Sequence, residues 1–108
     1  MYRRTLYTAI VILLSVAALS SCRVVPSRYI CSGNDLPPCY VVQRESRFDP
    51  QAENPTSTAS GLYQFLDGTW AGYKGYGHAS HAPVHVQVER ARQIWNGGRG
   101  CGHWNACV

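Results

Sequence analysis

Glu45 is the residue of this sequence whose surroundings best suit acid–base chemistry. It stands in the segment Gln43 to Pro50, and several aromatic side chains follow in a second segment that begins at Ala59. Apolar and aromatic surroundings favour the protonated form of a carboxyl group, which is the form that can donate a proton to a glycosidic oxygen. The sequence therefore predicts a proton donor at Glu45 and a glycan as its substrate.

Three of the 4 histidines are the other candidates for chemistry, because His78, His81 and His85 have a spacing that could hold a metal ion. A helix predicted to start at Pro83 separates His81 from His85, and no carboxylate or thiol is left to join them. We expect no metal and no cofactor, and we assign the histidines to an outer cleft or to the exposed surface. Ser46 is interpreted as a serine that bonds backbone carbonyls, not as a nucleophile.

Glu45 needs an element to position it, and the sequence predicts a helix directly before it. Asp35 suits the N-cap, and Pro37 or Pro38 would take the first helical position. Apolar residues then recur at helical spacing as far as Ser46. We therefore expect the first helix to deliver Glu45 at or near its C-terminal end.

Two further helices are predicted downstream. Apolar residues at helical spacing mark a second helical segment from Leu62 to Trp70, after an ordered loop over residues 48–60 that contains two prolines. A third helix opens at Pro83 and closes at Gly97. Its expected apolar stripe consists of Val84, Val88, Ala91 and Trp95. Its expected polar face carries Gln87, Arg90 and Gln93.

The first residues are typical of an export signal. Two arginines precede an apolar stretch that is too short to span a bilayer, which takes about 20 residues. A leucine and two serines then lead to Cys22, a pattern that resembles the lipobox of bacterial lipoproteins. We expect a signal peptide over residues 1–21, a lipid on Cys22, a tether over residues 22–36 and a domain over residues 37–108. The alternative is an ordinary secretory signal in which Cys22 is incidental.

The other cysteines form an even set once Cys22 is assigned to lipid. Four cysteines in an oxidising compartment imply two disulfides, for which three pairings exist. A domain of this size has a marginal core, and a bridge that joins its start to its end stabilises it by ~4 kcal/mol in the chain-entropy picture. We therefore predict the pairs Cys39–Cys107 and Cys31–Cys101.

The net charge is +4, and the basic residues are scattered along the chain. Binding to nucleic acid would need a basic patch or stripe, so we expect no nucleic-acid partner. A mildly positive balance suits an anionic cell wall.

The residues around Glu45 resemble the lysozyme-like superfamily between about residues 39 and 107. The nearest patterns are those of the soluble lytic transglycosylase domain and of the resuscitation-promoting-factor-like transglycosylases. The positions that carry the resemblance are Glu45, Ser46, Phe48, Asp49, Pro50, Ala52, Pro55, Ala59, Gly61, Leu62, Gln64, Thr69 and Trp70. The resemblance implies a mainly α, lysozyme-like α+β fold in a small single domain with disulfides.

The resemblance also implies an enzyme that cleaves the β-1,4 bond between N-acetylmuramic acid and N-acetylglucosamine in peptidoglycan, as a lytic transglycosylase or a muramidase. Glu45 takes the place of the family's catalytic acid, which later serves as base. Gln64 matches the family's glutamine that lines the sugar site. The alternative for Gln64 is a purely structural hydrogen bonder. The related transglycosylases manage with one carboxyl group, so a single-acid mechanism is expected. Further substrate contacts are predicted at Ser60, Tyr63, Tyr73 and Tyr76.

Two alternatives to an enzyme stay open at this point. One is a catalytically weak module that binds peptidoglycan through the same cleft, and the other is an anchored protein that recruits a further protein. Glu45 together with Gln64 favours the enzyme, because a binding module has no need of a poised acid. We expect a monomer, lipid-anchored at the outer face of the bacterial membrane. The carboxylates weighed as a second catalytic group are Asp35, Asp49, Glu53, Asp67 and Glu89.

Overall fold

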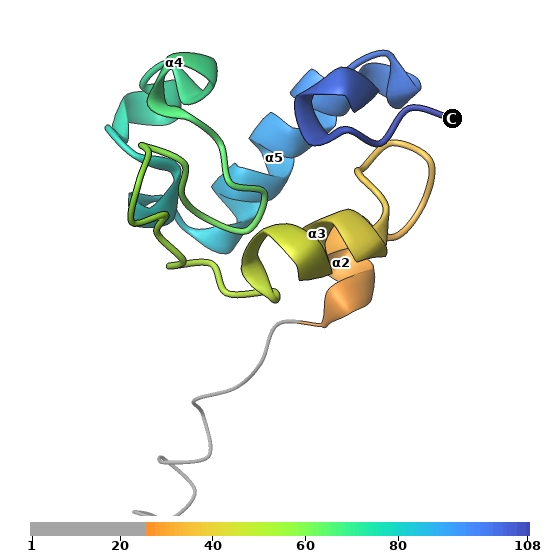
Figure 1. Cartoon of the computed structure of the whole chain (residues 1–108), viewed down its shortest axis with the longest axis horizontal. Coiled ribbons are helices and arrows are strands. Elements are labelled where there is room, and N and C mark those ends of the chain that lie inside the picture. The colour runs from red at the N-terminus through yellow and green to blue at the C-terminus, as the bar shows by residue number, and fades with distance from the viewer. Residues whose placement is uncertain (1–25) are drawn as a thin grey trace, which may run out of the picture.

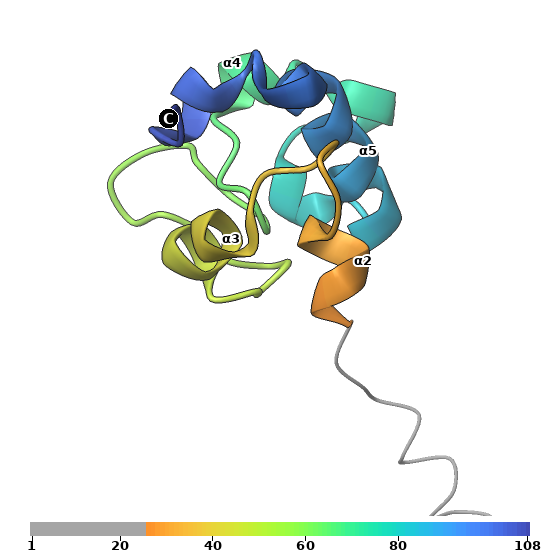
Figure 2. The ribbon, with the colours of Figure 1, turned by 90° about the vertical axis from the view of Figure 1, so that its right-hand side faces the viewer.

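A computed structural model describes residues 26–108, and the predicted signal peptide and Cys22 lie outside them. The described part is a small, mainly helical unit. Its α-helices are α2 (Ser27–Cys31), α3 (Cys39–Ser46), α4 (Asp67–Trp70) and α5 (Val84–Trp95). Short 3-10 helices cover Tyr73–Gly75, Ala79–His81, Asn96–Gly98 and Cys101–Trp104. Helices α2 and α3 lie at one end of the molecule, and α4 and the C-terminal tail lie at the other (Figures 1 and 2).

Helix α3 carries Glu45 in its last turn, which confirms the prediction for the first helix. It begins one residue after Pro38, whose carbonyl accepts a hydrogen bond from the amide of Val41 at 2.9 Å. The N-cap prediction for Asp35 is wrong, because its carboxylate pairs instead with Arg92 of α5 at 2.8 Å. The helix ends where Arg47 takes a left-handed conformation (φ 54°).

The second predicted helix is largely wrong, since only its last four residues, α4, are helical. Left-handed conformations at Gly61 (φ 83°) and Gln64 (φ 53°) stop a helix in the segment before it. That segment forms a tight turn, in which Ser60 and Phe65 exchange backbone hydrogen bonds of 3.0 and 3.1 Å. A second antiparallel bridge joins Glu53 to Ser60. The apolar residues recur at helical spacing because both sides of the turn are buried. Hydrophobic periodicity alone cannot distinguish such a turn from a helix.

Helix α5 begins after Pro83 and ends at a left-handed Asn96, close to the predicted bounds. Val88, Ala91 and Trp95 of its apolar stripe are buried. Gln87 was predicted on the polar face, but it is 0% exposed. A glutamine at this depth requires hydrogen-bond partners, because an unpaired buried amide is costly.

The core gathers aromatic rings from three separate segments. The ring of Trp104 in the tail lies 5.8 Å from Phe65, 6.0 Å from Trp95 and 6.4 Å from Tyr63, measured between centroids. Its indole nitrogen donates to the carbonyl of Tyr63 at 2.8 Å. The tail is therefore packed into the domain by one tryptophan with both an apolar body and a satisfied polar tip.

The segment predicted as a tether up to residue 36 is folded from Ser27 onward. Ile30 of α2 is 1% exposed and Leu36 is buried as well. The hydroxyl of Tyr63 donates to the carbonyl of Ile30 at 2.7 Å, which fixes α2 to the core. The domain thus begins before residue 37, because this otherwise polar stretch contributes the apolar side chains of Ile30 and Leu36 to the core.

Both predicted disulfide pairs are wrong. Cys31 bonds to Cys39 and Cys101 bonds to Cys107, with Cα–Cα distances of 5.0 and 4.9 Å. The first bridge closes the loop between α2 and α3, which turns back through a left-handed Gly33. The second brackets the last 3-10 helix and a left-handed Asn105. Local turns bring the cysteines of each pair together, so each bridge closes a short loop and neither joins the start of the domain to its end.

None of the helices within residues 26–108 has the length and apolar character needed to cross a membrane.

Candidate active site

The C-terminal end of α3 is fixed to the neighbouring turn by Ser46. This buried hydroxyl lies 2.7 Å from the carbonyl oxygen of Leu62 and 3.3 Å from that of Val42, so it can donate to either. Its oxygen is committed to backbone carbonyls, as expected for a serine at a helix terminus. The consequence is that the end of α3, one residue after Glu45, is attached to the turn of residues 61–65.

Glu45 reaches the C-terminal tail through its neighbour Arg44. The Nη2 atom of Arg44 donates to Oε2 of Glu45 at 3.2 Å, and the same nitrogen donates to the carbonyl of Trp104. The side chain of Glu45 remains 27% exposed. The apolar surroundings predicted for this carboxyl group are therefore not what the structure shows, because Glu45 contacts solvent on one side and is oriented by an arginine on the other.

A small pocket of about 60 Å³ opens next to this junction. It is lined by Gln64, Phe65, Leu66, Thr69, His103 and Trp104. Trp104 belongs both to the pocket and to the junction with α3, since it lines the pocket and its carbonyl accepts a hydrogen bond from Arg44. Glu45 is therefore linked through Arg44 to a tail residue that forms one wall of this pocket, and it is not itself among the lining residues.

Gln64 has the two features that the sequence left open. Its amide nitrogen donates to the carbonyls of Gly61 at 3.0 Å and Ala52 at 3.3 Å, so it stabilises the turn. The same side chain lines the pocket beside Trp104. A side chain held by two backbone carbonyls presents its amide oxygen in a fixed position, which suits recognition of a substrate donor.

Tyr63 is wrong as a predicted substrate contact. It is 0% exposed, and its hydroxyl is used by the carbonyl of Ile30. Burial raises the pKa of the Tyr63 phenol above its ordinary range, because the charged form would lose its hydration. This side chain is part of the core and cannot touch a ligand.

Tyr73 and Tyr76 contact the α4–α5 region. The hydroxyl of Tyr73 lies 3.2 Å from the Glu89 carboxylate and 3.0 Å from the Gln93 amide, both on α5. Its ring packs edge-on against Trp70 at 5.6 Å. Tyr76 accepts a hydrogen bond from Trp70 through its carbonyl. These two tyrosines are not among the residues that line the pocket beside Trp104.

Lys74 and Glu89 form an ion pair near Tyr73, with a distance of 2.9 Å between Nζ and Oε1. The hydrogen bond from Lys74 lowers the pKa of the Glu89 carboxyl and raises the pKa of the lysine. Glu89 is thus a paired surface carboxylate, and it has no place among the residues around Glu45.

Ser60 lies in a different pocket from Gln64. It is buried, and its Oγ accepts a hydrogen bond from the amide of Ser80 at 3.0 Å. This second pocket has a volume of about 240 Å³ and includes Glu53. The structure therefore separates Ser60 from the Glu45 junction, with which the sequence grouped it.

Two other carboxylates have local partners. Asp49 accepts from the amide of Gln51 at 2.9 Å, which makes it a loop cap. Asp67 lies 2.8 Å from Nδ1 of His78. Within residues 26–108, no three histidine, cysteine, aspartate or glutamate side chains are grouped as metal ligands.

Sequence reasoning missed His103 and Trp104 as parts of this site. The tail residues lie some sixty positions away, and only the packing of Trp104 brings them to α3.

Comparison with known proteins assigns the chain to a family. The family described as Transglycosylase-like domain matches residues 40–107, and the chain belongs to that family. Proteins named "Probable transglycosylase SceD" from Staphylococcus aureus strains Newman, USA300 and COL are each 48% identical to it over 69 residues. The match covers 59% of this chain and 29% of each relative, so the chain corresponds to less than a third of their length. No solved structure matches the chain.

Proposed function

We propose that this transglycosylase-like domain cleaves the glycan strands of peptidoglycan at the β-1,4 bond between N-acetylmuramic acid and N-acetylglucosamine. The observation that carries the proposal is the position of Glu45, at the end of α3 and bound through Arg44 to the tail that lines the pocket. Family membership supports the class of reaction. The specific bond and the role of Glu45 are our proposal.

The proposed reaction uses one carboxyl group. Protonated Glu45 donates its proton to the glycosidic oxygen, and the bond between that oxygen and the anomeric carbon of muramic acid breaks. The substrate's own N-acetyl group assists the departure. The carboxylate then accepts a proton from an internal hydroxyl of the muramic acid, which closes an anhydro ring and returns Glu45 to its starting state. Attack by water instead of the hydroxyl would give a muramidase product.

Mass spectrometry of the fragments released from purified peptidoglycan tests this proposal. We expect anhydro-muramyl products from the disulfide-bonded protein, and a loss of release of about 10²- to 10⁴-fold in Glu45→Gln, because the amide cannot donate the proton. Glu89→Gln is the matched control, since it removes a carboxylate that is paired on α5, and it should keep the release.

Three results would change the proposal. Reducing-end muramic acid would replace the transglycosylase with a muramidase. Undiminished release by Glu45→Gln would remove Glu45 from the mechanism. Binding of peptidoglycan by both proteins without any release would favour the alternative, a module that holds glycan strands without cutting them.

A further inference from the structure

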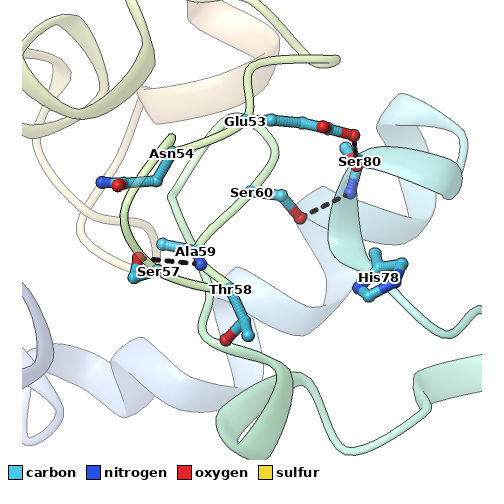
Figure 3. Close-up of a pocket in the computed structure, with 8 residues that line it drawn as sticks. All are labelled: Glu53, Asn54, Ser57, Thr58, Ala59, Ser60, His78 and Ser80. Atoms are coloured by element: carbon cyan, nitrogen blue, oxygen red, sulfur yellow. Dashed lines mark hydrogen bonds between the residues drawn. The ribbon is translucent and has the colours of Figure 1, made fainter.

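A second pocket lies between residues 53–60 and residues 78–80, and we refer to it as the hairpin pocket (Figure 3). Its volume is about 240 Å³, compared with about 60 Å³ for the pocket beside Trp104. It is lined by Glu53, Asn54, Ser57, Thr58, Ala59, Ser60, His78 and Ser80. No residue lines both pockets, so a ligand in the hairpin pocket would use contacts that the proposed cleavage does not.

Three hydroxyl oxygens in this pocket are fixed by backbone amides. Ser57 accepts from the amide of Ala59 at 3.2 Å. Thr58 accepts from the amide of Asp67 at 3.0 Å. Ser60 accepts from the amide of Ser80 at 3.0 Å. Because each hydroxyl is used here as an acceptor, its proton is left to donate. The pocket thus offers several positioned O–H donors.

The same pocket offers a carboxylate as acceptor. Figure 3 shows the side chain of Glu53 extending across to Ser80, whose hydroxyl lies 3.4 Å from Oε2. A carboxylate has two oxygens and about four acceptor positions, so this one long contact leaves capacity for a ligand. His78 adds a ring nitrogen, because its Nδ1 is paired with Asp67 at 2.8 Å and Nε2 is the remaining polar atom of the ring.

The charge of the lining residues selects among ligand classes. No lysine or arginine lines the pocket, and one carboxylate does, so the charge of the lining disfavours a phosphate or another anion. Positioned donors beside a carboxylate acceptor complement a neutral ligand whose hydroxyl groups both donate and accept. We propose that the hairpin pocket is a second saccharide-binding site, which holds an N-acetylated sugar of a glycan strand outside the cleavage site. The identity of the glycan rests on the proposed function.

Two-dimensional NMR of the Glu45→Gln protein tests the inference without cleavage of the probe. The probe is the tetrasaccharide of β-1,4-linked N-acetylglucosamine. We expect its addition to shift the amide signals of residues 57–60, His78 and Ser80. A further Glu53→Gln substitution should weaken that binding about tenfold, the loss expected for one hydrogen bond to a charged group. Glu89→Gln in place of Glu53→Gln should leave the affinity unchanged.

The outcomes separate this inference from the proposed function. Shifts confined to Thr69 and Trp104 would retain binding at the proposed cleavage site and overturn the hairpin site. Shifts in the hairpin pocket from a protein whose wild type leaves peptidoglycan uncut would support the hairpin site and overturn the cleavage proposal. An absence of shifts in the hairpin pocket, or an affinity unchanged by Glu53→Gln, overturns the inference. Ser80→Ala is the second variant if Glu53→Gln fails to fold, and it should weaken binding as well.

Discussion

The hairpin region of residues 50–62 and the aromatic core are held in place by different forces. The core packs Tyr63, Phe65, Trp95 and Trp104 with centroid distances of 5.8 to 6.4 Å. The hairpin region has mostly exposed side chains, and short polar residues bond its backbone. Apolar burial stabilises without direction, whereas hydrogen bonds stabilise only in one geometry. The comparison indicates that the core supplies the stability and that the hydrogen bonds define the shape of the hairpin region.

Gln87 connects the two regions. Its Oε1 accepts from the amide of Leu62 at 2.8 Å, and its Nε2 donates to the carbonyls of Pro50 at 3.0 Å and Ala82 at 2.9 Å. The backbone at Gly61 (φ 83°) passes so close that an added Cβ would lie 2.6 Å from Oε1. A glycine is needed there for both the conformation and the space.

Removal of Trp104 should disrupt the aromatic core and have the largest effect on stability. Trp104→Ala would lose a buried ring and the hydrogen bond to Tyr63, with a cost of about 4 kcal/mol in the free energy of unfolding. Urea denaturation followed by circular dichroism measures it. His103→Ala, an exposed neighbour, should change the value by less than about 0.5 kcal/mol. Equal costs for the two variants would mean that the tail does not help to hold the core.

Gln87→Leu should remove the hydrogen bonds that connect the hairpin region to α5 and leave the aromatic core packed. The apolar side chain leaves the amide of Leu62 and two carbonyls without partners, so we expect a loss of about 2 to 3 kcal/mol. Hydrogen exchange should show faster exchange at Leu62 than in the middle of α5. Gln93→Leu, on the exposed side of the same helix, should cost less than about 1 kcal/mol. Uniform acceleration throughout the domain would show that the hairpin region is not separately held.

Tyr63→Phe should have the smallest effect and sharpen the boundary of the core. It removes one buried hydrogen bond and leaves the carbonyl of Ile30 without that partner, at a cost of about 1 to 2 kcal/mol. Exchange of the α2 amides should rise more than that of α5. A change restricted to α5 would contradict the attachment of α2 to the core through this hydroxyl.

The elements that the sequence predicted well have local determinants. A proline followed by apolar residues at helical spacing precedes both α3 and α5, and each helix ends near the predicted residue. The position of Glu45 in the last turn of α3 follows from that pattern alone. Gln87 shows the limit, since a glutamine on a helix is expected to face solvent unless distant partners satisfy it.

The predictions that failed depend on contacts between distant residues or on conformations that few residues adopt. The helix expected from Leu62 became a turn because Gly61 and Gln64 take positive φ values. The disulfides pair cysteines that local turns bring together.

The sequence by itself determined the family, the two longer helices and the placement of the candidate acid at a helix end, because these are encoded by residue type and spacing along one segment. The tertiary structure alone decided what surrounds Glu45. Arg44 links Glu45 to Trp104, and Gln64 lines the same pocket as Trp104, because the tail packs through one tryptophan and the turn is fixed by Ser46 and Gln87. Contacts between segments far apart in the chain result from the packing of the whole core, and no local pattern specifies them.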